Sequence, residues 1–134
     1  MATVGLTASA LSETPEGQDL TLSQWRALVV LAESDGQHVG DLADRLAVSL
    51  PSASRLVRRL ERRGLVSAER DEEDRRATRL HLLPRGRDAH RAVVAARRDR
   101  IARALAARRE PLPGEPAAAL RALAEALDGS GYGR

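Results

Sequence analysis

Hydroxyl and guanidinium side chains are concentrated in one short stretch of the chain, residues 49–63. The candidate contact residues there are Ser49, Ser52, Ser54, Arg55, Arg58 and Arg59. Serine is small enough to let a helix approach a ligand closely, and arginine donates a fork of N–H groups that matches phosphate oxygens and guanine edges. These residue types in this order favour nucleic-acid binding. An arginine-rich helix face taken alone, however, is more often simply solvated.

A second group of charges lies in a loop, residues 71–77, between two short stretches with strand-like patterns. The candidate contact residues in this loop are Asp74, Arg75 and Arg76. An arginine near the tip of a hairpin can enter a narrow minor groove. Residues 71–74 are all acidic, so phosphates would repel the loop unless Arg75, Arg76 and Arg79 dominate.

Two helices are predicted ahead of the arginine-rich stretch. Thr21 and Gln24 form a capping-box pattern before a run of apolar residues at helical spacing, which residues 34–36 should end. A second helix is predicted over residues 39–47, where apolar side chains again recur on one side. The break after residue 47 is short, as in a helix-turn-helix.

The arginine-rich stretch itself is predicted to be a third helix that begins after Ser49, which can cap it, and stops at Gly64. Short strands are then predicted over residues 65–70 and 78–83, the second from its period-two alternation. The fold class is therefore mainly α with a small β-hairpin. The order of helices, glycine stop and arginine-tipped hairpin predicts a winged helix-turn-helix over about residues 23–83.

The composition supports a small helical protein with a strongly basic middle. The chain has 134 residues, 43% of them hydrophobic and 1% aromatic, and it contains no cysteine. Residues 55–109 carry a net charge of +10, whereas residues 1–54 carry −5 and residues 110–134 carry −2. No apolar run is long enough to span a membrane and no secretory signal is apparent, so we expect a cytoplasmic protein.

Catalytic and metal-binding chemistry find little support in the sequence. The three histidines, His38, His81 and His90, fall in a loop, a strand and a helix, and no cysteine accompanies them. No serine is spaced from a histidine and an aspartate as a nucleophile would be, and there is no glycine-rich phosphate loop. We therefore expect neither an enzyme nor a metal or cofactor. Trp25 is a candidate for a ligand pocket, although a core position is the simpler interpretation.

Three stretches carry a resemblance to a known family: LTLSQWRALVVLAE, GDLADRLAVSLPSASRLVRRLERRGLV and DEEDRRATRLHLLPRGR. Through them, Leu22 to Arg87 resembles the MarR family of winged-helix transcriptional regulators. The resemblance implies that residues 50–63 read the major groove, that Arg76 enters the minor groove and that Asp74 orients it. It also implies a homodimer on a pseudo-palindromic operator, and most members are repressors relieved by a small ligand.

The resemblance also suggests a division of the chain. The expected parts are a partly disordered or truncated first helix over 1–20, a DNA-binding lobe over 21–87, dimerisation helices over 88–128 and a flexible tail over 129–134. The residues expected at the dimer interface are Val94, Ile101, Leu105, Leu120, Leu123 and Leu127. The acidic wing and the short start of the chain motivate an alternative, a winged-helix protein-interaction module that has lost DNA binding.

Overall fold

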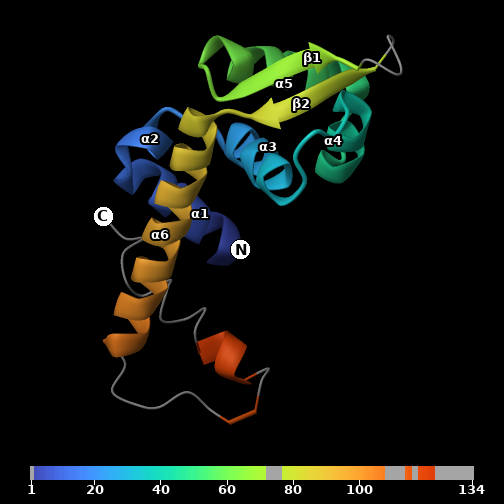
Figure 1. Cartoon of the computed structure of the whole chain (residues 1–134). Coiled ribbons are helices and arrows are strands. Elements are labelled where there is room, and N and C mark those ends of the chain that lie inside the picture. The colour runs from blue at the N-terminus through green and yellow to red at the C-terminus, as the bar shows by residue number, and fades with distance from the viewer. Residues whose placement is uncertain (1, 72–76, 108–113, 116–117, 123–134) are drawn as a thin grey trace. The chain divides into compact units, whose positions relative to one another are not determined.

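The computed structural model describes residues 2–71, 77–107, 114–115 and 118–122, and it is mainly helical (Figure 1). Its elements in chain order are α1 (Ala2–Glu13), α2 (Pro15–Gln18), α3 (Leu22–Glu33), α4 (Val39–Leu46), α5 (Leu50–Arg62), β1 (Val66–Arg70), β2 (Thr78–Leu82) and α6 (Pro84–Ala106). They form two compact units, one of Asp19–Ala92 and one of Met1–Gln18 with Val93–Arg134. Across the described residues, no helix has the length and apolar character needed to cross a bilayer.

The start of α3 confirms the predicted capping box. The Gln24 N–H donates to the Thr21 hydroxyl at 3.2 Å, and the Thr21 N–H donates to the Gln24 side-chain oxygen at 2.9 Å. Two N–H groups that would otherwise lack partners are thereby satisfied, which fixes where the helix begins. The helix ends at Glu33, with Ser34 as its C-cap, as the sequence predicts.

The turn between α4 and α5 is tight because one residue takes a left-handed conformation. Ala47 has φ +55°, and the N–H of Val48 returns to the Ala43 carbonyl at 3.0 Å. Ser49 is the N-cap residue of α5, but the prediction that its hydroxyl caps the helix is wrong. That hydroxyl donates to the Ser52 hydroxyl at 2.9 Å instead. The glycine stop is confirmed, since Gly64 follows the helix with φ +66°.

The predicted hairpin is confirmed as an antiparallel pair of strands, with Val66 opposite Leu82 and Arg70 opposite Thr78. An isolated bridge between His38 and Arg79 joins the start of α4 to this hairpin. At the far end, α6 begins so close to the hairpin that a Cβ on Gly86 would lie 2.2 Å from the Leu65 carbonyl oxygen. Only glycine fits there without a shift of backbone.

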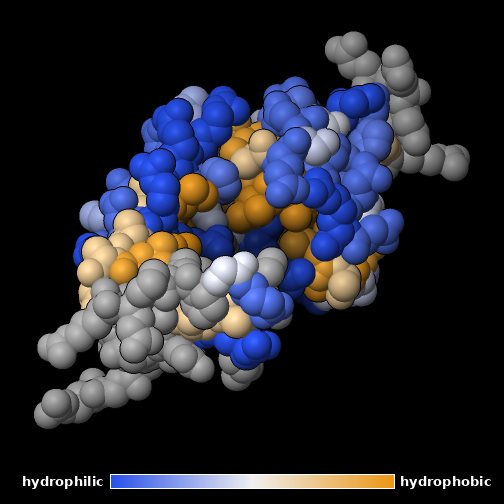
Figure 2. Space-filling model, turned by 90° about the horizontal axis from the view of Figure 1, so that it is seen from below, coloured by the Kyte–Doolittle hydropathy of each residue, from blue (hydrophilic) through white to orange (hydrophobic). Residues whose placement is uncertain are grey.

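The core of the 19–92 unit lies between its three helices and the hairpin. Its fully buried side chains include Leu28 and Leu31 from α3, Leu42 from α4, Leu60 from α5 and Leu80 from β2. Each element contributes the apolar side of its pattern, so burial of that side positions the polar side of α5 outward. Figure 2 shows mainly hydrophilic side chains on the face drawn, with apolar side chains between them in patches.

The other unit combines α1 and α2 with the later part of α6. The N-terminal segment, for which the sequence left disorder open, forms α1 and ends ahead of Pro15. Glu13 ties it to α6, with one carboxylate oxygen 2.9 Å from Arg100 Nη1 and the other 3.7 Å from Arg103 Nη2. Of the expected dimerisation helices over 88–128, the part after residue 115 is described only at residues 118–122, which are helical.

Candidate nucleic-acid interface

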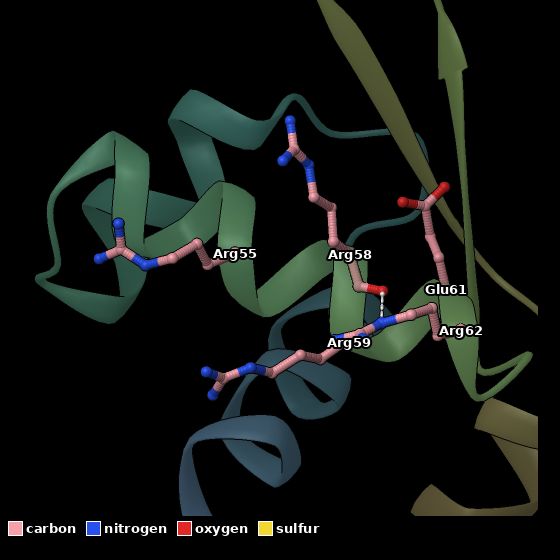
Figure 3. A pocket seen from close by; sticks show the side chains of 5 residues that line it. All are labelled: Arg55, Arg58, Arg59, Glu61 and Arg62. Carbon is pink, nitrogen blue, oxygen red and sulfur yellow. Dashed lines mark hydrogen bonds between the residues drawn. The ribbon is translucent and has the colours of Figure 1, made fainter.

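The outward face of α5 carries the arginine side chains. Ala53, Val57 and Leu60 are buried on the opposite side of the helix. Exposed guanidinium groups at helical spacing line an open hollow along the helix, together with one carboxylate (Figure 3); the residues that line it are Arg55, Arg58, Arg59, Glu61 and Arg62. The predicted contacts Arg55, Arg58 and Arg59 therefore share one surface, and we call this surface the arginine face.

The first turn of α5 links two of the predicted serines to the first of these arginines. The Ser52 hydroxyl oxygen lies 2.9 Å from the Ser49 hydroxyl and 3.0 Å from Arg55 Nη2, and it accepts from both. Ser52 can still donate its own proton, because a hydroxyl is both donor and acceptor. Ser54, the third predicted serine, is half-buried at the edge of the arginine face.

Arg62 belongs to the arginine face although it is absent from the predicted contacts. It is exposed, lines the same hollow and donates from Nε to the Arg58 carbonyl at 3.4 Å (Figure 3). The signal that could have found it is its spacing, since it follows Arg58 by four residues and Arg55 by seven.

Arg63, the next residue along, has a structural role. Its guanidinium donates to the Asp19 carbonyl at 2.6 Å and to the Gln24 side-chain oxygen at 3.3 Å. The side chain is only 25% exposed, whereas that of Asp19, 3.9 Å away at its carboxylate, is 85% exposed. Arg63 therefore fastens the end of α5 to the start of α3, and its charge does not add to the arginine face.

The base of the wing holds a buried carboxylate at a position where the sequence predicts an exposed acidic loop. The Asp71 side chain is 4% exposed, and its Oδ2 lies 2.7 Å from His38 Nε2 and 2.9 Å from Arg79 Nε. Arg79 also donates to the Gly36 carbonyl at 3.4 Å. The Asp71 charge is therefore compensated inside the protein, and Arg79 is engaged there. We call Asp71, His38 and Arg79 the wing-base cluster. The predicted wing contacts Asp74, Arg75 and Arg76 lie outside the described residues.

Asp35 fixes the other end of strand β2. Its two carboxylate oxygens lie 3.0 Å from the Leu82 N–H and 3.2 Å from His81 Nδ1. Burial alone would raise the pKa of Asp35, but the hydrogen bonds from Leu82 and His81 and the positive charges nearby outweigh it and lower this pKa below its ordinary value.

Trp25 lies in the core and stacks on His90. Their ring centroids are 5.2 Å apart with an interplanar angle of 16°, and Trp25 is 3% exposed. Burial lowers the pKa of His90, because the charged imidazolium loses hydration, while Glu33 opposes this shift. The ligand role of Trp25 stays a prediction. Within the described ranges, no three histidine, aspartate or glutamate side chains come together as a metal-binding group.

The residues predicted at a dimer interface lie on α6 and after it. Val94 and Leu120 are 43% and 69% exposed, whereas Ile101 and Leu105 are half-buried. Leu123 and Leu127 lie outside the described residues. The exposed pair leaves apolar surface available for a partner, and the interface stays a prediction.

Helices α3 to α6, the tight turn and the β1–β2 hairpin together define a winged helix-turn-helix protein. In a comparison with known proteins, residues 18–77 match the family model described as "MarR family". The chain is 39% identical over 75 residues to the transcriptional activatory protein BadR of Rhodopseudomonas palustris, a match that covers 54% of this chain and 43% of the relative. The chain thus spans about half the length of the curated relatives it matches.

Solved structures extend the comparison beyond the winged helix. The crystal structure of RV1404 from Mycobacterium tuberculosis matches with a TM-score of 0.78 at 29% identity, and covers 98% of this chain and 88% of that one. A crystal structure of the S. aureus MepR–DNA complex matches with a TM-score of 0.63 at 25% identity, over 72% of this chain and 77% of that one. Over residues 18–77 this chain therefore matches the MarR family of winged-helix transcriptional regulators, and the solved structures share its fold.

Proposed function

We propose that this protein represses transcription by binding a pseudo-palindromic operator as a homodimer, with α5 in the major groove of double-stranded DNA. The observation that carries the proposal is the arginine face, which is exposed on a helix that a tight turn and a buried core hold in place. A family relative has been solved in complex with DNA. An α-helix fits the major groove, and arginines bind both phosphates and guanine edges there.

The two ends of the arginine face have different tasks. At the start of α5, Ser52 and Arg55 are held together by a hydrogen bond and contact base edges. Farther along, Arg58, Arg59 and Arg62 contact phosphates, so that counterions are released on binding. Glu61 lines the same hollow and disfavours phosphates on its side of the helix.

The wing and the dimer complete the proposed complex. Arg76 enters the minor groove, Asp74 orients it and Arg75 binds the adjacent backbone. The apolar residues after the lobe, with Val94 and Leu120 exposed among them, pair two copies so that two α5 helices bind successive half-sites. A small aromatic ligand bound near Trp25 releases the DNA.

Binding is tested with the full chain. Duplexes are selected from fragmented genomic DNA, and affinity is measured by fluorescence anisotropy at several salt concentrations. We expect affinity to fall steeply with salt, and Arg76→Ala to weaken binding by about 1–3 kcal/mol. Arg91→Ala is the matched control, because Arg91 is an exposed arginine on α6 that pairs with Asp88. Failure to bind any duplex would instead favour the protein-interaction alternative.

The direction of regulation is tested separately. A reporter gene under the selected operator should be expressed less when this protein is present and more when a relieving ligand is added. BadR is named a transcriptional activatory protein, so activation is the specific rival. A reporter whose expression rises with the protein would support activation and contradict repression, while leaving DNA binding intact.

A further inference from the structure

One leucine at the start of α5 is exposed and follows Ser49 directly in the sequence. Leu50 is the first residue of the helix and is 55% exposed, whereas Leu42 and Leu60 of the same lobe are fully buried. It lies between Ser49 and Pro51, and Ser52 follows one residue later. An exposed leucine alone is common. This one stands at the N-terminal end of the helix that the proposed function places in the major groove.

The backbone around Leu50 is held in place on both sides. Before it, Ala47 has φ +55° and the Val48 N–H donates to the Ala43 carbonyl at 3.0 Å. After it, the Ala53 N–H donates to the Ser49 carbonyl at 3.0 Å. Pro51 restricts its own φ and the conformation of the residue before it. The turn that carries the Leu50 side chain is therefore rigid, so its backbone loses little conformational freedom on binding.

The chemistry of the major groove gives this side chain one natural partner. Residues at the N-terminus of the second helix of a helix-turn-helix contact base edges. Leu50 offers no donor or acceptor, and thymine alone among the four bases presents a methyl group in the major groove. We propose that Leu50 reads a thymine by contact with its C5 methyl group. This inference rests on the proposed function and adds a specificity determinant to the arginines and serines.

The chain offers a matched control for this residue. Leu22 is also the first residue of its helix, follows an N-cap residue and is 39% exposed, but it begins α3 and not α5. Substitution of either leucine by alanine removes a similar exposed side chain at a helix start. Only the Leu50 variant removes one from the start of the recognition helix.

The test exchanges single methyl groups on the DNA. In a duplex selected by the wild-type protein, each thymine is replaced in turn by deoxyuridine, which lacks the C5 methyl group and keeps the same base pairing. Dissociation constants are measured by anisotropy for the wild type, Leu50→Ala, Leu50→Met and Leu22→Ala. We expect the wild type to lose about threefold to fivefold in affinity at one thymine of a half-site, as burial of one methyl group implies.

The variants then separate the outcomes. Leu50→Ala should bind the thymine and deoxyuridine duplexes equally, whereas Leu50→Met and Leu22→Ala should keep the wild-type preference. A Leu50→Ala variant that retains the preference, or a wild type that shows none at any thymine, would overturn this inference and leave the proposed function standing. A wild type that binds no duplex would overturn the proposed function and this inference with it.

Discussion

Two groups of arginines in the 19–92 unit have opposite surroundings. On the arginine face, Arg55 and Arg62 form their hydrogen bonds along α5 itself and their side chains are exposed. Elsewhere, Arg63 and Arg79 donate to groups on other elements, and the latter is paired with a buried carboxylate. Part of the positive charge of this sequence is therefore engaged within the protein and is not exposed on the arginine face. The first group exposes its charge on the surface, and the second group joins elements of the fold to one another.

The wing-base cluster gives the largest expected effect. Asp71→Ala should lower the free energy of unfolding by about 2–3 kcal/mol, because it removes the buried carboxylate that accepts charge-assisted hydrogen bonds from the half-exposed His38 and Arg79 side chains. Urea denaturation followed by circular dichroism measures this. Asp71→Asn, which keeps the shape and one acceptor oxygen, should cost less. Equal stability of wild type and Asp71→Ala would show that the wing-base cluster does not stabilise the fold.

A substitution on the arginine face should affect DNA affinity and leave folding intact. Arg59→Ala removes an exposed guanidinium whose proposed partner is a phosphate, so we expect a loss of about 1–2 kcal/mol in binding. The salt slope should fall by about two, because each protomer of the proposed homodimer loses one phosphate contact. The free energy of unfolding should stay within about 0.5 kcal/mol of wild type. If stability fell and the salt slope did not change, Arg59 would stabilise the fold and would not contact a phosphate.

Arg63→Ala reverses that pattern and is the sharpest contrast, because Arg63 follows the arginine face directly. It should lower the free energy of unfolding by about 1 kcal/mol through loss of the hydrogen bonds to Asp19 and Gln24. Its salt slope should match the wild type. Urea denaturation and the salt titration are measured on the same preparation. A reduced salt slope would mean that Arg63 is part of the protein surface that contacts DNA.

The elements of the lobe were predictable from sequence, because their signals are local. The capping box of Thr21 and Gln24, the stop at Gly64 and the alternation of the second strand each involve residues close together in the chain. The apolar stripe of α5 likewise decides which side of that helix is exposed. The arginine face therefore followed from spacing, with Arg62 as the omission.

What the sequence could not provide depends on contacts between distant residues. His38 meets Asp71 across 33 positions, and Arg63 meets Asp19 across 44. No periodicity distinguishes Arg63 from Arg62, because only the fold brings an acceptor to one and not to the other. The Ser49 hydroxyl failed as a predicted cap for a different reason. Pro51, in the first turn of α5, has no N–H to donate to it, and the hydroxyl donates to Ser52.

The smallest expected effect is a pH dependence of the free energy of unfolding, which arises at His90. Burial lowers the pKa of His90 from its ordinary value of 6.5. Below pH 6.5 the unfolded chain takes up a proton at His90 that the folded protein does not, so the free energy of unfolding falls as pH drops. This loss stops growing once pH is below the lowered pKa.

His90→Gln should remove that part of the pH dependence, because the glutamine side chain does not ionise. Urea denaturation of both proteins at half-unit steps from pH 8 to pH 5 measures it, and the difference between the two curves should be flat above pH 7 and slope below pH 6.5. Loss of the stack on Trp25 also shifts the variant's curve by a constant amount, so the slope of the difference is the informative quantity. A difference with no slope would mean that His90 takes up its proton equally readily in the folded and unfolded states.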